Sequence, residues 1–312
     1  MVDPLAEVVT LLQPQARYSK LVGGSGSWNI RRAESGQPFY CVVLDGGCRL
    51  TPDGQAPLQL RQGDFVLIPA AQGYTMSSLA PALPQAADSV PVELPQGQFR
   101  LGDPDGAPEV LLLVGHCAFG SPDAALLVSL LPQLVHVRGE HRLATLVQLV
   151  MDESRARRPG REVILAHLME VLLIEALRST AEKNADNGSE NLAAPGLLRG
   201  LADDRLAAAL RCMHDDMARA WTVAELAQQS ALSRSAFFER FSRAVGVAPM
   251  EYLLAWRMAC AKDLLRRKEG GGIAAVAERV GYSSASAFSV AFARHVGMPP
   301  ARYARGQMAA PS

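Results

Sequence analysis

Long apolar runs and an apolar leader are both missing from this sequence of 312 residues. No stretch approaches the roughly 18 uncharged apolar residues that a membrane-spanning helix needs. The first residues, Met1 to Pro4, begin no basic segment followed by an apolar one, so the pattern predicts no secretory signal. These absences argue against a membrane protein and against an exported one, and we expect a cytoplasmic protein.

Cysteine is scarce, and the cysteines present are widely scattered with no Cys-x-x-Cys motif. An odd and scattered set argues against a disulfide framework and against a zinc finger. We therefore expect reduced, buried thiols at Cys41, Cys48, Cys117, Cys212 and Cys260.

Net charge is also absent, because 31 basic and 31 acidic residues cancel. The balance hides an asymmetry. From residue 200 onward, 15 Lys and Arg face 10 Asp and Glu, and the preceding part has the opposite bias. A basic C-terminal part is typical of a protein whose far end meets a polyanion such as DNA.

The N-terminal part, as far as Leu113, has the pattern of a β domain. Short apolar runs over residues 39–44, 48–51, 58–60, 65–68 and 110–114 alternate with turn sequences such as Asp45-Gly46-Gly47. Strands of this length and spacing indicate a sandwich or a small barrel. Residues 80–108 hold six prolines, which predict a long loop or an insertion.

Beyond residue 122 the pattern becomes helical, and we expect helices over residues 124–131, 141–154 and 161–183. The last has apolar residues on more than one face. Two interpretations stay open: a core helix, or a helix that packs on its copy in a dimer. For the dimer, the expected contact residues are Leu165, Leu168, Leu172 and Glu175. Residues rich in Asn, Ser and Gly then predict a linker over 184–200.

A pair of helices joined by a tight turn follows the linker. Thr222 and Glu225 have the spacing of a capping box at the start of a helix over residues 223–229. Ser233 then caps a second helix, in which Phe237 and Phe241 lie four apart on one face. A helix, a short turn and a capped second helix predict a helix-turn-helix unit.

The same pattern recurs once. A short helix over residues 273–280 precedes Ser284, which caps a helix with Phe288 and Phe292 again four apart. Each unit ends in Val-Gly-x-x-Pro-x-x-Tyr, and such an internal repeat predicts two copies of one fold. A helix over residues 250–267 joins them and spans roughly 27 Å, which suits neighbouring major-groove segments about 34 Å apart.

The repeated units resemble the AraC/XylS family of transcription regulators over the last third of the chain. The residues that carry the resemblance are Ala227, Ser233, Phe241, Gly246, Pro249, Tyr252, Arg257, Ala261, Leu264, Ala277, Gly281, Tyr282, Ser284, Phe288, Phe292, Gly297, Pro299 and Tyr303. The resemblance implies a protein that binds double-stranded promoter DNA and changes transcription. It implies no enzyme activity, and it makes RNA polymerase a candidate partner.

With the phenylalanines turned inward, the opposite faces of the two second helices are left to read DNA. The first presents Ser235, Phe238 and Glu239, and the second presents Ala285, Ser286, Ser289 and Val290. The family often has Arg or Gln at such positions, whereas neither helix here offers an obvious bidentate Arg to guanine. We expect readout by serine hydroxyls, by apolar contact with thymine methyls, by Glu239 accepting from cytosine and by DNA shape. The residues expected to contact phosphates are Arg234, Arg240, Arg243 and Arg294.

Residues Gly63 to Pro69 resemble the second cupin motif, but Tyr74 stands where the metal-binding His of that family lies. The His-x-His of the first motif is absent from residues 39–60. A metal site needs several converging ligands, so we expect neither a metal nor another cofactor, which argues against a metal-dependent cupin enzyme. The resemblance that remains is to the cupin-like sensor domain of many AraC-type regulators.

The mouth of a β-barrel is a common small-molecule site, and we expect an effector there, of unknown identity. The candidate lining residues are Tyr40, Val42, Tyr74, Met76, His116 and Cys117. A redox-responsive regulator is the alternative: His116 would lower the pKa of the Cys117 thiol, which would pair with Cys41 or Cys48. Cys41 and Cys48 flank an expected hairpin turn, which would bring them near each other. A DNA binder with no effector is a further alternative.

Together these patterns predict a two-domain α+β homodimer. A cupin-like β-barrel with a helical dimerisation segment over 122–183 occupies residues 1–183, and an all-α double helix-turn-helix domain occupies 201–307.

Overall fold

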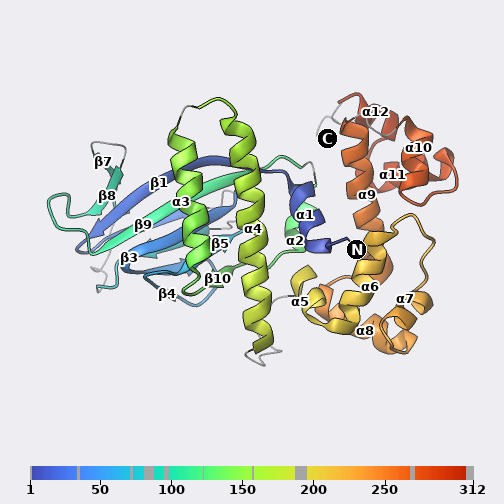
Figure 1. The fold of residues 1–312 in the computed structure, drawn as a ribbon, viewed down its shortest axis with the longest axis horizontal. Coiled ribbons are helices and arrows are strands. Elements are labelled where there is room, and N and C mark those ends of the chain that lie inside the picture. The colour runs from blue at the N-terminus through green and yellow to red at the C-terminus, as the bar shows by residue number, and fades with distance from the viewer. Residues whose placement is uncertain are drawn as a thin grey trace. The chain divides into compact units, whose positions relative to one another are not determined.

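The computed structural model describes residues 2–33, 36–70, 73–80, 88–94, 98–121, 123–156, 158–186, 195–267 and 271–306. Its contacts divide the chain into two compact units, and both are coloured by residue number in Figure 1. The sheet unit contains Gln13–Gly120 and Pro132–Glu190. The helical unit contains Met1–Leu12, Ser121–Leu131 and Asn191–Ser312. None of the helices in the described ranges is long and apolar enough to cross a bilayer.

The sheet unit is built from ten described strands that curl into a half-barrel. Seven follow the order β10-β5-β3-β9-β1-β8-β7, while β4 and β6 pair with β3, and β2 pairs with β6. The strands are β1 (Pro14–Ser25), β2 (Asn29–Ala33), β3 (Phe39–Pro52), β4 (Leu58–Arg61), β5 (Phe65–Ile68), β6 (Gly73–Ser77), β7 (Val92–Leu94), β8 (Gln98–Gly102), β9 (Val110–Phe119) and β10 (Val135–Val137).

Strand β3 forms the corner of the curl. Its first residues pair with β5 and β9, and residues from Arg49 to Pro52 pair with β6. The expected hairpin turn at Asp45-Gly46-Gly47 is wrong, because β3 runs through these residues with a register shift against β9 between Val43 and Asp45. Gly46 has a φ of 70°, and a Cβ there would meet the carbonyl of Glu109. The glycines therefore bend one strand rather than reverse the chain.

Side chains of β3 alternate between the interior of the curl and the helices that cover its outer face. Phe39, Cys41 and Val43 belong to the buried interior cluster, so Tyr40 and Val42 point to the other face. That face is covered by α3 (His141–Arg155) and α4 (Arg161–Asp186), which pack against β1, β3 and β10 (Figure 1). One face thus encloses a cavity, and the other is an ordinary sheet–helix core.

The described residues of the helical unit form helices and the turns between them. Its helices are α1 (Pro4–Leu12), α2 (Ala124–Ser129), α5 (Leu197–Ala202), α6 (Asp204–Asp215), α7 (Val223–Gln229), α8 (Arg234–Val245), α9 (Pro249–Arg267), α10 (Ile273–Arg279), α11 (Ala285–Val296) and α12 (Pro300–Ala304). The predicted helix pairs correspond to α7–α8 and α10–α11, and α9 joins them.

The predicted fold class is confirmed: a curled half-barrel with helices comes first, and a helical helix-turn-helix region follows. Two short segments lie elsewhere than expected, because α1 and α2 pack in the helical unit against α6, α9 and each other. Of the predicted linker over 184–200, α4 takes the part to Asp186 and α5 takes the part from Leu197. Residues 187–194 lie outside the described ranges.

Candidate nucleic-acid interface and effector cavity

The first helix-turn-helix unit begins with the predicted capping box. The Thr222 side chain accepts from the backbone of Glu225 at 3.2 Å, and the Glu225 carboxylate accepts from the backbone of Thr222 at 2.8 Å. Ser233 caps α8 by accepting from the Ala236 backbone at 3.3 Å. Phe237 and Phe241 are fully buried on one face, so the opposite face of α8 is turned to solvent.

The second unit repeats this arrangement of a serine cap and two buried phenylalanines further along the chain. Ser284 caps α11 by accepting from the Ala287 backbone at 3.1 Å, and Phe288 and Phe292 are fully buried. Gly246 after α8 and Gly297 after α11 both adopt the left-handed conformation that ends a helix. The leading helix α10, by contrast, begins at Gly272 with no side-chain cap.

The turns inside the two units have the same backbone and different residues. Ala231 has a φ of 49°, and Gly281 has a φ of 84°. Each follows a short helix and donates back into its last turn, Ala231 to Gln228 and Gly281 to Glu278, both at 3.0 Å. The first turn thus places a β-carbon in the left-handed region, which a glycine occupies without strain.

Helix α9 connects the units as a single element of 19 residues. A helix of this length spans roughly 28 Å. Arg257 in its middle donates to the carbonyls of Met217 at 2.7 Å and Arg219 at 2.6 Å, which precede the first unit. Its Nη2 also lies where a Cβ on Gly281 would meet it, so one side chain contacts the surroundings of both units. Burial lowers the pKa of Arg257 from its ordinary value.

Carboxylates from early in the chain brace both ends of α9. Glu7 of α1 accepts from His214 Nδ1 at 2.6 Å, and the Tyr252 hydroxyl lies 2.7 Å from the other ring nitrogen. Asp123, just before α2, pairs with Lys262, and both side chains are largely buried. The first brace lies under α8, which packs on Tyr252, and the second lies near His295 and Tyr303 of the second unit.

The residues predicted to read DNA lie on the faces opposite the phenylalanines. On α8, Arg234, Ser235, Phe238, Glu239, Arg240 and Arg243 are all exposed. On α11, Ser286, Val290 and Arg294 are exposed, whereas Ala285 and Ser289 are partly buried. Phe238 and Val290 are 45% and 69% exposed, which is unusual for large apolar side chains and leaves them available for contact with a partner.

Three of these side chains already have partners within the chain, and one of them is Ser235, whose Oγ lies 3.4 Å from the Oγ of Ser233. Arg240 is paired with Asp203, the residue that caps α6. Ser289 donates its hydroxyl to the carbonyl of Ala285 at 2.7 Å. Their roles at the DNA stay predictions, and Arg240 would first have to leave Asp203 to reach a phosphate.

The residues named for a dimer face mostly inward. Leu165, Leu172 and Glu175 are buried within their own chain, and Leu168 is half-buried. The reason is that α4 packs against α3, β1 and β10 along this face. Among the described side chains of α4, the large apolar ones that are exposed are Val163, Ile164 and Val171.

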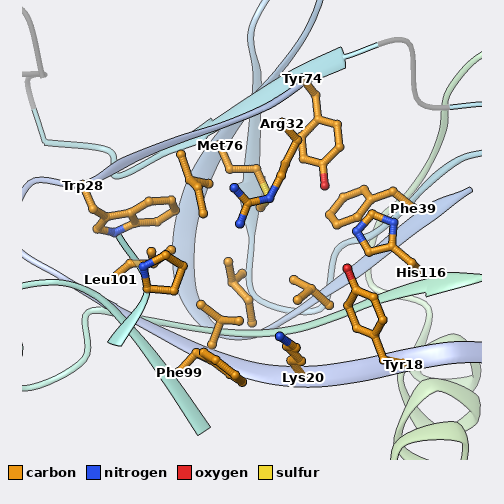
Figure 2. A pocket seen from close by; sticks show the side chains of 15 residues that line it. Tyr18, Lys20, Trp28, Arg32, Phe39, Tyr74, Met76, Phe99, Leu101 and His116 are labelled. Carbon is orange, nitrogen blue, oxygen red and sulfur yellow. The ribbon is translucent and has the colours of Figure 1, made fainter. Parts of the chain in front are cut away.

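The interior of the half-barrel holds a cavity of about 130 Å³, shown in Figure 2. Three of the predicted effector residues, Tyr74, Met76 and His116, line it. Tyr40, Val42 and Cys117 do not, because they are buried on the face toward the helices, where Tyr40 bonds to Ser19 at 2.6 Å. A strand exposes alternate side chains to one face, so the choice between odd and even positions decided the assignment of Tyr40 and Val42 on β3 and of Cys117 on β9.

Lining residues that the sequence did not suggest come mainly from β1, β2 and β8. They are Tyr18, Lys20, Val22, Trp28, Ile30, Arg32, Phe39, Pro91, Phe99, Leu101, Leu112 and Val114. The alternation of Tyr18, Lys20 and Val22 was a signal that could have identified an inward-facing strand.

Aromatic rings form one wall of the cavity. Phe39 stacks on Tyr74 with ring centroids 4.5 Å apart, and His116 lies between Phe39 at 5.4 Å and Tyr18 at 5.1 Å. Figure 2 shows these four rings around one end of the cavity. Burial, and then the charges of Arg32 and Lys20, lower the pKa of His116, so the imidazole is neutral near pH 7.

The cysteines of the redox alternative are buried in the sheet unit. Burial raises the pKa of Cys117 and of Cys48 to about 12, and raises that of Cys41 as well. His116 therefore does not activate Cys117 in the way the sequence suggested, because the thiolate form is disfavoured by burial. Cys41 and Cys48 lie on the same strand, β3, rather than on two sides of a turn.

A metal has few ligands available here. In the part of the chain that the structure describes, no three His, Cys, Asp or Glu side chains gather closely enough to hold an ion. Among the described residues, the cavity lining includes a single histidine and no carboxylate.

Comparison with family models gives two matches. Residues 3–182 match a family described as Cupin, and residues 226–306 match a family described as Helix-turn-helix domain. The two matches leave residues 183–225 between them, a stretch that includes α5, α6 and the first residues of α7.

Two curated relatives match along nearly the whole chain. A putative AraC-like transcription regulator of Streptomyces lividans is 37% identical over 307 residues, covering 96% of this chain and 97% of its own. Another putative AraC-like transcription regulator, of Streptomyces antibioticus, is 36% identical over 312 residues, covering 98% and 99%.

Among solved structures, ToxT from Vibrio cholerae O395 is 13% identical, with coverage of 96% of this chain and 99% of that one and a TM-score of 0.36. The DNA-binding domain of AdpA in complex with a target DNA is 29% identical. The match covers 32% of this chain and 89% of that one, with a TM-score of 0.31.

Proposed function

The chain belongs to the AraC-like transcription regulators, and we propose that it reads promoter DNA with both helix-turn-helix units under the control of a small molecule held in the half-barrel. The observation that carries the proposal is the pair of matching units on one rigid connecting helix, each with an exposed face on its second helix.

The connecting helix supports simultaneous reading by α8 and α11. Neighbouring major-groove segments on one face of B-DNA lie about 34 Å apart, and the 19 residues of α9 are of comparable length. Arg257 and the two braced ends stiffen this helix against its neighbours. A rigid spacing of this kind favours a site with two elements about one helical turn apart.

The reading faces differ in chemistry. Helix α8 presents Ser235 and Glu239 beside Phe238, and we assign Glu239 to a cytosine amino group. Helix α11 presents Ser286 and Val290, which suit hydroxyl contacts and thymine methyls. Arg234, Arg243 and Arg294 would hold the phosphate backbone without reading sequence.

Control by an effector rests on the cavity in the sheet unit, which is lined mainly by apolar and aromatic side chains with a few polar groups. That composition is typical of small-molecule sites. The protein would act through DNA affinity and carry out no reaction of its own.

We further expect a homodimer that uses the exposed apolar face of α4. Val163, Ile164 and Val171 are between 41% and 61% exposed, and Ile164 and Val171 are seven residues apart on one face of the helix. Val171→Arg should give a monomer by analytical ultracentrifugation, whereas exposed Glu162→Gln on the same helix should leave the mass unchanged. A Val171→Arg variant that still sediments as a dimer would place the interface elsewhere.

The reading faces can be tested by adding one negative charge to each. Ser235→Glu and Ser286→Glu should each weaken binding of a DNA fragment, recovered by selection on the wild-type protein, by at least about tenfold. The reason is that the new carboxylate would face phosphates. Fluorescence anisotropy measures the affinity, and circular dichroism checks that the fold is retained.

Gln59→Glu adds the same charge on exposed β4 and serves as the matched control. It should bind the fragment as the wild type does. If only one of the two helix variants loses affinity, DNA is read by one unit, and the two-element proposal fails.

A further inference from the structure

The cavity of the half-barrel has an unbalanced set of charges. Lys20 and Arg32 line it together with His116, and no Asp or Glu is among the lining residues that the structure describes. Figure 2 shows the Arg32 guanidinium and the Lys20 ammonium directed into the space between the aromatic rings. Arg32 is exposed and Lys20 is partly buried. Two cations that line an apolar cavity with no carboxylate competing for them favour an anionic ligand.

Neither cation is neutralised by the protein within the described ranges. Lys20 Nζ lies over the ring of Phe99, 4.1 Å from its centroid, and over Tyr18 at 5.2 Å. Arg32 has one polar contact, to the carbonyl of Arg31 at 3.3 Å, while neighbouring Arg31 takes the ion pair with Asp53. The ion pairs found elsewhere in the sheet unit therefore do not extend into the cavity.

The surroundings of the two cations suit a flat, apolar body. The rings of Tyr18, Phe39, Tyr74 and His116 line one end, and Trp28 and Phe99 lie at the other (Figure 2). The cavity measures about 130 Å³. A protein cavity of roughly 150 Å³ is known to hold one benzene ring, so the space fits a single ring and not a long chain.

We propose that the effector cavity binds a small aromatic carboxylate, with the carboxylate between Lys20 and Arg32 and the ring against Phe39 and Tyr74. The regulatory role of this ligand rests on the proposed function, whereas its binding is inferred from the cavity alone. A bidentate contact from Arg32 and a point charge from Lys20 would hold the carboxylate. The rings would exclude water around it.

Three probes of one size test the charge: benzoate, benzamide and benzylammonium. Isothermal titration calorimetry on the full chain should show benzoate binding at least about tenfold more tightly than benzamide, a difference of about 1.4 kcal/mol, and benzylammonium binding least. Equal affinity for benzoate and benzamide, preference for benzylammonium, or no binding of benzoate at 10 mM would each overturn the proposal. Inorganic phosphate binding as tightly as benzoate would overturn the role given to the rings.

Variants of the two cations test whether Lys20 and Arg32 cause the preference for benzoate over benzamide. Lys20→Met and Arg32→Met should each weaken the binding of benzoate by about tenfold and leave the affinity for benzamide unchanged. Arg17→Met removes an exposed charge from the same strand without touching the cavity, and it should change neither affinity. If Arg17→Met weakens benzoate as much as Arg32→Met does, the effect is one of overall charge, and the assigned site is wrong.

His116 offers a readout within the cavity. Lys20 and Arg32 help to lower its pKa, so a bound carboxylate that neutralises them should raise that pKa. The shift is measured by NMR titration of the imidazole, with His116→Gln to assign the signal among six histidines. No upward shift at saturating benzoate would contradict the placement beside these cations.

The two proposals fail in different ways. Selective binding of benzoate with no change in DNA affinity would keep the assigned ligand class and remove effector control. A change in DNA affinity produced by benzamide as strongly as by benzoate would keep effector control and remove the assigned class.

Discussion

The first helix-turn-helix unit starts on a reciprocal capping box, and the second starts on a glycine with no side-chain cap. The first keeps Ala231 in its turn at a φ of 49°, and the second has Gly281 at 84°. The first is braced by Glu7 through His214, and the second by Asp123 through Lys262. One backbone plan is thus maintained by different local interactions, and each difference can be removed separately.

The largest difference is expected between the two braces. Lys262→Met leaves the Asp123 carboxylate buried without its partner, and removal of one member of a buried pair costs about 3–5 kcal/mol. Glu7→Gln should cost less, because Glu7 is 34% exposed and its neighbour His214 keeps Tyr252 as a partner. Urea unfolding measures the stability, and hydrogen exchange should show α10–α12 opening more than α7–α8 in Lys262→Met.

The control for this prediction removes both charges. The double variant Lys262→Met with Asp123→Asn should recover part of the stability lost by Lys262→Met, because no unpaired charge remains. A double variant as unstable as the sum of its single variants would mean that the ion pair does not brace the second unit.

The next largest difference lies in the turns. Gly281→Ala should destabilise the protein by about 1–3 kcal/mol. The alanine would have to keep the positive φ of Gly281, and its Cβ would meet the carbonyl oxygen of Ala218 at 2.5 Å and Arg257 Nη2 at 2.8 Å. Ala231→Gly should instead be neutral or stabilising by less than about 1 kcal/mol, since relief of strain offsets the entropy of the unfolded glycine. Thermal unfolding followed by circular dichroism compares the two, and equal effects would show that the turns are not equivalent.

A smaller effect is expected at the helix caps. Thr222→Ala removes the capping box of α7 and should cost about 1 kcal/mol. Thr222→Ser keeps the hydroxyl and should retain most of the stability. Because α10 has no such cap, the loss should appear as faster hydrogen exchange in α7 with no change in α10, and equal acceleration in both helices would contradict a local effect.

The smallest effect concerns phosphate contacts. Arg294→Ala on α11 should weaken binding to all DNA sequences alike and reduce the salt dependence by about one unit of slope. Arg240→Ala on α8 should reduce the slope by less, because Arg240 is paired with Asp203. Anisotropy titrations between 50 and 200 mM salt measure both slopes, and a sequence-specific loss in Arg294→Ala would assign Arg294 to base readout.

The helical unit could be predicted closely from sequence because its signals are local. The caps at Thr222, Ser233 and Ser284 and the inward phenylalanine pairs follow from spacings of three and four residues, and the structure has them as expected. The DNA-reading roles of the exposed faces were inferred because these faces lie opposite the buried phenylalanines, and these roles stay predictions.

The sheet unit was harder because its geometry depends on pairing between distant strands. Gly46 reads as a turn residue and serves as a bend inside β3. Lys20 and Arg32 lie on β1 and β2, whose polar and glycine-containing sequences did not suggest strands. The even and odd positions of β3 could be told apart only once the helices were seen to cover one face.

Reading of DNA by both units at once is tested most directly by genome-wide selection of DNA fragments on the purified protein at two salt concentrations. We predict enrichment of a sequence with two elements about one helical turn apart, with weaker binding but the same sequence at the higher salt. Salt-sensitive binding with no enriched sequence, or enrichment of a single element, would contradict the double reading.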